Sequence, residues 1–266
     1  MNTLRISLLQ YDIAWEDKEA NFLKIGSLLA QSEEKHDILI LPEMFSTGFS
    51  MNSPTLAEPI SGKTLNRIKS LARQYDAAIA GSFIAEDKGH YFNRGFFITP
   101  TAEYFYDKRH LFRMGSEPEH FSAGNSKLIV PFRGFNICLL VCYDLRFPVW
   151  ARNSNNEYDL LIYVANWPRT RALVWDTLLP ARALENQAYV CGVNRIGTDA
   201  TGLHYSGDSK LIDFKGNLLI HIPEEEKIVT AIISTDKLNT FRHKFPVWKD
   251  ADAFILTTND KHLPMR

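Results

Sequence analysis

The chain has 266 residues, of which 45% are hydrophobic and 23% are charged, and its formal net charge is −1 at pH 7. These values are typical of a soluble globular protein, and the balanced charge argues against a nucleic acid or an anionic membrane surface as partner. The N-terminal apolar segment is too short for a signal peptide, and no apolar run is long enough to span a membrane. We therefore expect no membrane partner.

Apolar runs of strand length alternate with segments of helical spacing along the chain. In chain order, the pattern predicts a strand over 6–10, a helix over 18–31, a strand over 38–42, a helix over 64–75, strands over 77–84, 91–99, 103–107, 127–131 and 136–142, a helix near 147–154, a strand over 159–164, a helix over 171–186, strands over 188–194, 209–213, 217–221 and 227–233, and a last helix over 237–243. Helices between apolar strands indicate a layered α/β structure. Because no Ser/Gly-rich stretch or block of one charge interrupts the pattern, we expect one domain over residues 1–266.

The three cysteines are expected to be reduced. Cys138 and Cys142 lie four apart on one predicted strand, about 13 Å at the strand rise, which is too far for a disulfide. Cys191 lies in another apolar run and is predicted to be a core residue. Reduced thiols indicate a cytoplasmic location.

Cys142 is the strongest candidate for a catalytic residue. It ends the apolar run 136–142, and the next residues are predicted to open a helix. Helix N–H groups and the helix dipole favour negative charge, so the thiol is expected to be biased toward thiolate. Ligand crevices of α/β sheets also lie beyond the carboxyl ends of strands. The alternative interpretation is a small core residue, the usual role of a lone cysteine at the end of a strand.

Two charged residues also follow predicted strands. Glu43 comes after an apolar run that ends in Pro42, and Lys108 comes after an aromatic run. A glutamate could take the proton of the thiol, and a lysine could stabilise a developing oxyanion. Taken singly, either residue could be an ordinary exposed loop charge.

Three segments around these residues resemble the signature blocks of the nitrilase superfamily. They are Leu-Pro-Glu-Met-Phe at 41–45, Asp-Lys-Arg-His-Leu-Phe at 107–112 and Val-Cys-Tyr-Asp-Leu-Arg-Phe-Pro at 141–148, in the order and at the spacing of the family. Segments 165–168 and 181–187 also resemble family blocks, and the resemblance covers roughly residues 4 to 254. The residues around the motifs, such as 148–153, resemble the omega-amidase branch, which hydrolyses 2-oxoglutaramate and related 2-oxo acid amides.

The resemblance implies an αββα four-layer sandwich that assembles as a homodimer. It also implies that Cys142 attacks an amide to form a thioester, with Glu43 as the base. Lys108 and the backbone N–H of Tyr143 would stabilise the oxyanion, and Glu117 would orient Lys108. This chemistry needs no cofactor, and the sequence shows neither metal-ligand spacing nor a glycine-rich phosphate loop.

The substrate pocket is less clearly defined by the sequence. Tyr143, Phe45, Asn166 and Trp167 are candidates to line it, although Phe45 and Trp167 could equally be core residues. A 2-oxo acid needs a cation for its carboxylate, and the candidates are Arg169, Arg171 and Arg195. Asp144 and Arg146 are expected to brace the turn after Cys142. The apolar residues Phe147, Val149 and Trp150 are expected to be exposed and to seek a second copy.

Two alternatives remain open at this point. One is an N-carbamoyl amine or amino acid hydrolase, or an amidase for another small amide. The other is a catalytically silent scaffold that keeps the fold and binds a partner. The omega-amidase branch usually has histidine before the tryptophan that corresponds to Trp175, whereas this chain has Val174.

Overall fold

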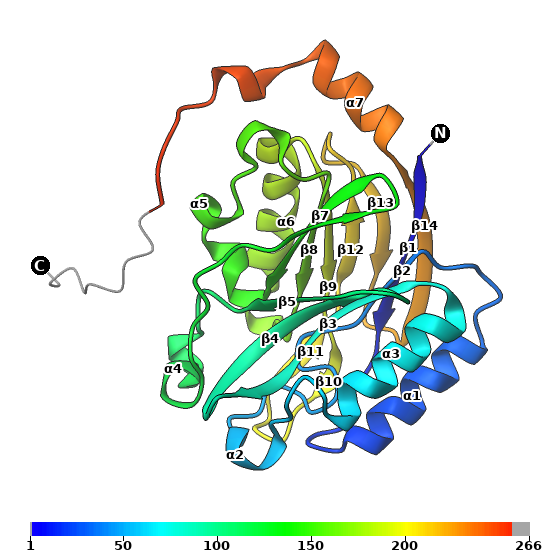
Figure 1. The fold of residues 1–266 in the computed structure, drawn as a ribbon, viewed down its shortest axis with the longest axis vertical. Helices are drawn as coiled ribbons and strands as arrows, with labels where there is room; N and C mark the ends of the chain where they lie inside the picture. The colour runs from blue at the N-terminus through cyan, green and yellow to red at the C-terminus, as the bar shows by residue number, and fades with distance from the viewer. Residues whose placement is uncertain (1, 257–266) are drawn as a thin grey trace, which may run out of the picture.

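Two six-stranded sheets lie face to face at the centre of the computed structural model, which describes residues 2–256 (Figure 1). The first sheet has the order β14 (Lys227–Ser234), β1 (Thr3–Gln10), β2 (Ile38–Ile40), β3 (Ala78–Asp87), β4 (His90–Ile98) and β5 (Glu103–Asp107). The second has the order β13 (Leu218–Ile222), β12 (Ser209–Ile212), β9 (Tyr189–Val193), β8 (Leu160–Val164), β7 (Phe135–Val141) and β6 (Ile129–Phe132).

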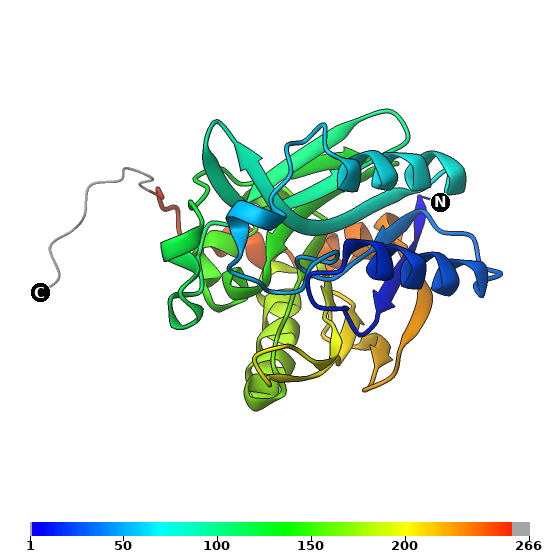
Figure 2. The ribbon, with the colours of Figure 1, turned by 90° about the horizontal axis from the view of Figure 1, so that it is seen from below.

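Helices cover the outer face of each sheet (Figures 1 and 2). Helices α1 (Lys18–Ala30) and α3 (Lys63–Tyr75) pack on the first sheet, and α6 (Ala172–Asn186) packs on the second. The expected αββα sandwich is therefore confirmed. Helix α7 (Thr235–Lys244) follows the last strand.

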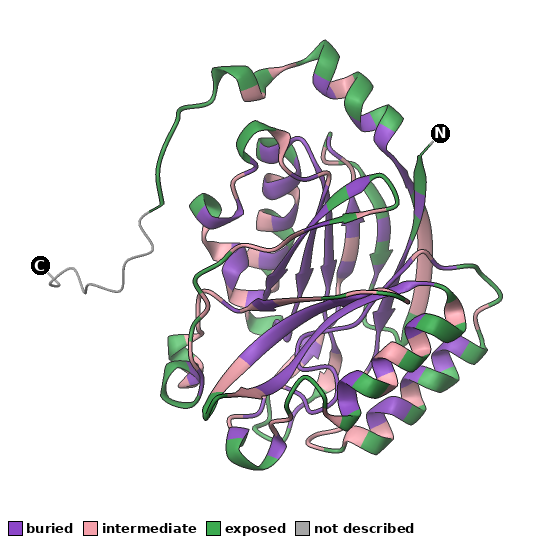
Figure 3. Cartoon of the chain, viewed as in Figure 1, coloured by how far each residue is buried: buried purple, intermediate pink, exposed green. Residues whose placement is uncertain are grey.

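The alternation of side chains along the strands explains why there are two cores. In β1, Leu4, Ile6 and Leu8 point to the core between the sheets, whereas Leu9 points to the core under the helices. From Ile137 to Val141, strand β7 is apolar and fully buried, as is typical of a strand covered on both faces. Burial is accordingly concentrated on the strands of both sheets (Figure 3).

The carboxyl ends of the three strands that precede the candidate residues lie at one edge of the sandwich. Strands β2 and β3 are parallel, and two antiparallel steps through β4 give β5 the same direction. In the second sheet, β7, β8 and β9 are parallel to one another. This arrangement brings the segments after β2, β5 and β7 to a common crevice.

The predicted strands and long helices are present with small shifts at their ends, but several short elements were not predicted. They are the hairpin β10 (Ile196–Thr198) and β11 (His204–Ser206) and the one-turn helices α2 (Ser53–Leu56) and α4 (Glu117–His120). The helix predicted near 147–154 is only the single turn α5 (Pro148–Ala151). It ends there because the side chain of Asn153 bonds to backbone groups of Tyr158 instead of leaving the backbone free to continue the helix. Within residues 2–256, no helix is long and apolar enough to cross a membrane.

Candidate active site

Glu43 lies just beyond β2 and is completely buried. Its Oε1 accepts hydrogen bonds from Lys108 Nζ at 2.8 Å and from Asn93 Nδ2 at 2.7 Å, and its Oε2 accepts from the backbone N–H of Asn166 at 2.8 Å. The next residue, Met44, has a left-handed φ of 43°. A sharp turn therefore follows the carboxylate directly, as is common where a functional side chain must be aimed.

Lys108 lies just beyond β5, and its ammonium is buried between two carboxylates. Its Nζ is 2.8 Å from Glu43 Oε1 and 3.0 and 2.9 Å from the two oxygens of Glu117. Burial alone would lower the pKa of Lys108, but the charges of Glu117 and Glu43 outweigh it and raise the pKa above its ordinary value. The lysine is therefore a permanent cation at the floor of the site.

Glu117 is the first residue of α4 and is fully buried, whereas Glu119 on the same turn is exposed. Besides Lys108, it accepts hydrogen bonds from Asn93 Nδ2 at 2.9 Å and from the backbone N–H of Phe112 at 2.5 Å. Burial and the nearby charge of Glu43 raise the pKa of Glu117, although Lys108 opposes them. The structure thus places Glu117 against Lys108, as the sequence predicted.

Cys142 follows β7 and begins a five-residue 3-10 helix, with a left-handed φ of 43°. Its Sγ lies 3.9 Å from the carbonyl oxygen of Asn166. Burial, and then the charge of Glu43, raise the pKa of the thiol well above its ordinary value, although Lys108 lowers it. The expected bias toward thiolate is therefore wrong. The helix is too short to supply the dipole that the sequence suggested, and burial and the charge of Glu43 both disfavour the thiolate.

Asp144 braces the turn after Cys142, as expected. Its carboxylate accepts hydrogen bonds from the hydroxyl of Tyr106 at 2.8 Å and from the backbone N–H of Val141 at 3.0 Å. It also bonds to the backbone N–H of His110 at 3.0 Å and to the His110 ring at 2.7 Å. The His110 ring stacks on Phe147, 3.7 Å between centroids. His110 is therefore part of the scaffold and not the base of a Cys–His pair.

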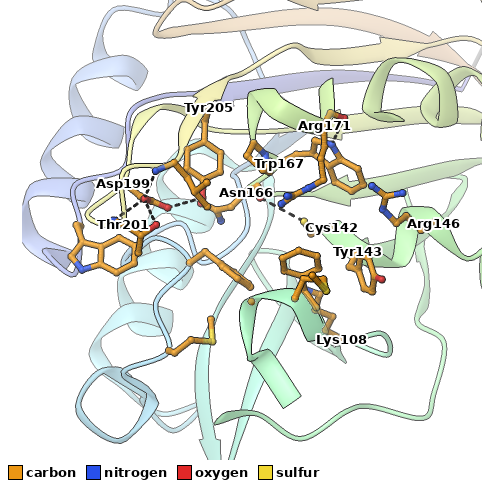
Figure 4. Close-up of a pocket in the computed structure, with 18 residues that line it drawn as sticks. Lys108, Cys142, Tyr143, Arg146, Asn166, Trp167, Arg171, Asp199, Thr201 and Tyr205 are labelled. Carbon is orange, nitrogen blue, oxygen red and sulfur yellow. Dashed lines mark hydrogen bonds between the residues drawn. The ribbon is translucent and has the colours of Figure 1, made fainter. Parts of the chain in front are cut away.

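A cavity of about 490 Å³ opens above Lys108 and Cys142 (Figure 4). Three of the four predicted lining residues, Tyr143, Asn166 and Trp167, face it. Asn166 also holds Glu43, because its Nδ2 donates to the carbonyl oxygen of Glu43 at 2.6 Å in addition to its backbone bond.

Phe45 is not a pocket residue, so that prediction is wrong. It is fully buried in the core under the helices, where it makes edge contacts with Phe22 at 5.5 Å and Phe96 at 5.7 Å. The left-handed turn at Met44 directs the chain so that Phe45 packs away from the cavity. The aromatic wall is instead formed by Phe49 and Phe112, which lie near the ends of the first two motifs.

The far end of the cavity belongs to the unpredicted hairpin β10–β11. Figure 4 shows Asp199, Thr201 and Tyr205 on one side of Cys142 and Arg146 on the other, with Arg171 between them near Trp167. Although burial opposes it, hydrogen bonds from Thr201 and Tyr205 hold the pKa of Asp199 below its ordinary value. The two ends of the cavity therefore carry opposite charge.

Of the three arginines considered for a substrate carboxylate, only Arg171 lines the cavity. Arg169 is exposed and pairs with Glu224, and Arg195 is buried and pairs with Asp12 at 2.7 Å.

Arg146, expected only to brace the turn, also lines the cavity. Its guanidinium lies 5.3 Å from the Trp167 ring, and that of Arg171 lies 5.0 Å from the Phe112 ring. Among residues 2–256, neither Arg146 nor Arg171 forms an ion pair with an acidic side chain.

Comparison with known proteins agrees with this geometry. The family model for carbon-nitrogen hydrolases matches residues 5–243. The chain belongs to the carbon-nitrogen hydrolase family. This hydrolase is 44% identical over 258 residues to omega-amidase YafV of Escherichia coli, covering 96% of the chain and all of the relative. It is 32% identical over 251 residues to a 2-oxoglutaramate amidase of Bacillus subtilis, covering 92% and 96%.

A solved structure supports the same assignment. XC1258 from Xanthomonas campestris, described as a CN-hydrolase superfamily protein with an arsenic adduct in the active site, superposes with a TM-score of 0.94. It is 43% identical, and the match covers 97% of this hydrolase and all of that chain. The expected nitrilase superfamily, its omega-amidase branch and the expected enzyme class, an amidase, are confirmed.

Replacing Glu43 with glutamine should separate two reactions of Cys142. The charge of Glu43 raises the pKa of the thiol, so the neutral isostere lowers that pKa and increases the thiolate fraction at a given pH. Iodoacetamide should then label Cys142 about threefold faster or more at mildly alkaline pH, while amide hydrolysis is lost. Mass spectrometry of the labelled peptides measures both the rate and its site.

Glu119→Gln is the matched control, because Glu119 is exposed and should leave labelling unchanged. Cys138 and Cys191 are fully buried and must stay unlabelled in a folded variant. Slower labelling of Cys142 in Glu43→Gln would show that Glu43 ionises the thiol in the resting protein.

Proposed function

We propose that this protein hydrolyses the terminal amide of short 2-oxo dicarboxylic acid monoamides, 2-oxoglutaramate above all, to the 2-oxo acid and ammonia. The observation that carries this proposal is a buried thiol beside a buried Glu–Lys–Glu cluster, in a cavity with two arginines that have no acidic partner among residues 2–256. The names of the omega-amidase and 2-oxoglutaramate amidase relatives support the same substrate class.

In this proposal, Glu43 takes the proton of Cys142 as sulfur attacks the amide carbon. Lys108 Nζ and the backbone N–H of Tyr143 stabilise the oxyanion, a contribution of roughly 3–4 kcal/mol for a well-placed donor. Collapse of the intermediate breaks the C–N bond, and Glu43 returns its proton to the leaving ammonia. Water, deprotonated by Glu43, then attacks the thioester, and Cys142 leaves as a thiol. Glu117 keeps Lys108 oriented throughout.

The arginine end of the cavity selects the substrate in this proposal. Arg171 and Arg146 would bind the carboxylate of the substrate while its amide reaches Cys142. Fixed positive charge would thus place the amide of a short substrate at the thiol. The Trp167 and Phe112 rings beneath the two guanidinium groups hold them in place.

We further propose that the chain acts as one catalytic domain in the cytoplasm. Support for the location comes from its three cysteines, which are all free and buried.

Cys142→Ala should abolish ammonia release, because no other group in the cavity can form the thioester. Cys138→Ala and Cys191→Ala are the matched controls, since both are core cysteines away from the cavity and should keep most of the activity. Ammonia release from 2-oxoglutaramate is the measurement, and circular dichroism confirms folding. Substantial turnover by Cys142→Ala would exclude the covalent mechanism.

Arg171→Ala should lower kcat/KM for 2-oxoglutaramate about 30- to 100-fold, the usual effect of losing a hydrogen-bonded charge partner. Butyramide, which has the amide but no carboxylate, should be turned over slowly by the parent and equally slowly by the variant. Arg169→Ala, two residues away but exposed and paired with Glu224, should stay within about twofold of the parent. Equal losses on both substrates would argue against carboxylate recognition by Arg171.

We also propose that the protein is a homodimer that uses the α5 face. Val149 is 52% exposed there and lines a groove with Phe147, whereas Trp150 is buried and donates to the Tyr106 hydroxyl. The expectation that Trp150 is exposed is therefore wrong.

Light scattering should give about twice the chain mass of 30.4 kDa. Val149→Glu should shift it toward the monomer, because a charge would be buried without a partner. Leu173→Glu, on the exposed face of α6, is the control. A parent protein that is monomeric at micromolar concentration would refute the proposal.

A further inference from the structure

Asn93 is a buried polar residue in β4 that lies outside every motif used in the sequence analysis. Its Nδ2 donates to Glu43 Oε1 at 2.7 Å and to Glu117 Oε1 at 2.9 Å. Lys108 Nζ donates to the same two oxygens, at 2.8 and 3.0 Å. Asn93 is therefore a second, uncharged bridge between the two carboxylates.

A neighbouring serine fixes which way the Asn93 amide points. Ser82 Oγ lies 2.9 Å from Asn93 Oδ1 and also accepts the backbone N–H of Met44 at 2.8 Å. Because the hydroxyl oxygen of Ser82 accepts from Met44, its hydrogen is free to donate to Asn93 Oδ1. A flipped amide would turn its oxygen toward two carboxylates, so only the observed orientation satisfies every group.

The Ser82–Asn93 pair holds both the side chain and the following backbone of Glu43. Met44, whose N–H bonds to Ser82, is the residue in the left-handed conformation directly after Glu43. Through β3 and β4 of the same sheet, the Ser82–Asn93 pair thus links the turn after β2 to the carboxylate of Glu43.

The two oxygens of Glu43 are consequently unequal. Oε1 accepts from two donors, Lys108 and Asn93, whereas Oε2 accepts from one donor within the described residues, the Asn166 N–H. An oxygen with two donors already bound is the weaker proton acceptor, because those bonds favour its charged form.

We propose that Asn93, oriented by Ser82, is a positioning residue that reserves Oε2 of Glu43 for the proton of Cys142. This inference rests on the proposed role of Glu43 as the base. Asn93 does not touch the reacting atoms, and it acts by loading Oε1 with a second donor and by keeping the carboxylate plane fixed.

The direction of the expected pH effect follows from the charges that face Glu43, which are Lys108, Glu117 and Cys142. Asn93 is neutral, so its removal leaves these charges unchanged and takes away one hydrogen bond to the Glu43 carboxylate. A base that loses a donor is held less firmly in its charged form, so catalysis should need a higher pH. The acid limb of the pH profile should therefore move upward.

The test compares Asn93→Ala, Asn93→Asp and Ser82→Ala with the parent, using the pH dependence of kcat and of KM for 2-oxoglutaramate. Asn93→Ala should lower kcat about 100-fold with KM within about twofold, and its acid limb should rise by about one pH unit. Asn93→Asp replaces the donor with an acceptor that faces two carboxylates, and it should lower kcat further than Asn93→Ala. Ser82→Ala should shift both quantities in the same direction but less.

Asn153→Ala is the matched control, because Asn153 is also a buried asparagine but bonds to Tyr158 and Asn186 near α5. It should lower the midpoint of urea unfolding without moving the acid limb. A shift of the same size in Asn153→Ala, or an unmoved limb in Asn93→Ala, would reduce Asn93 to a structural residue and overturn the proposal.

A second readout does not depend on the substrate. Asn93→Ala loosens the Glu43 carboxylate, whose charge disfavours the thiolate, so iodoacetamide should label Cys142 faster than in the parent at the same pH, but less so than in Glu43→Gln. If the parent protein fails to hydrolyse 2-oxoglutaramate, the proposed function is wrong, and the labelling rate still decides the role of Asn93.

Discussion

The ammonium of Lys108, buried between the carboxylates of Glu43 and Glu117, is the interaction on which the rest of the site depends. An isolated charge in such a position costs several kcal/mol, and only partners with close geometry offset that cost. Lys108 has them at 2.8 to 3.0 Å. Burial, and then the charge of Glu43, raise the pKa of the Cys142 thiol, although Lys108 opposes them. In the proposed mechanism, nucleophile and base therefore keep their proton inside the pair until an amide arrives.

The packing of the two sheets against each other brings the side chains of the site together. Glu43 and Lys108 come from the first sheet and Cys142 from the second, so the site forms only when the sheets pack. Strands buried on both faces make that packing specific, because a shift by one residue would exchange the side chains that face the two cores. Left-handed turns at Met44 and Cys142 then aim two of the side chains into the crevice. Backbone strain at these two positions thus lies where the site needs a sharply turned side chain.

How much the sequence could predict depended on whether a property was local. The strands and the positions of Glu43, Lys108 and Cys142 at strand ends could be predicted from apolar runs. The sandwich and the place of Glu117 were implied by the resemblance of the motifs to a known family. Properties set by distant neighbours could not be predicted. The pKa of Cys142 depends on burial and on a carboxylate 99 positions earlier in the chain. Phe45 was predicted to line the pocket because a methionine at position 44 gives no sign of the left-handed turn there. Asn93 carries no local signal at all.

The charges of the cavity also bear on how an anionic substrate is oriented. The Glu–Lys–Glu floor has an excess negative charge, and Asp199 at the hairpin end stays ionised. Both repel a carboxylate, whereas Arg146, on the far side of Cys142 from Asp199, and Arg171, which lies between them, attract it (Figure 4). A monoamide with one carboxylate therefore has one favourable orientation, with its uncharged amide over Cys142. A molecule charged at both ends would have to place an anion against Glu43, at a cost that increases as water leaves the site. The negative charge of the Glu–Lys–Glu cluster thus also repels the dicarboxylate product, which favours release of the product after each turnover.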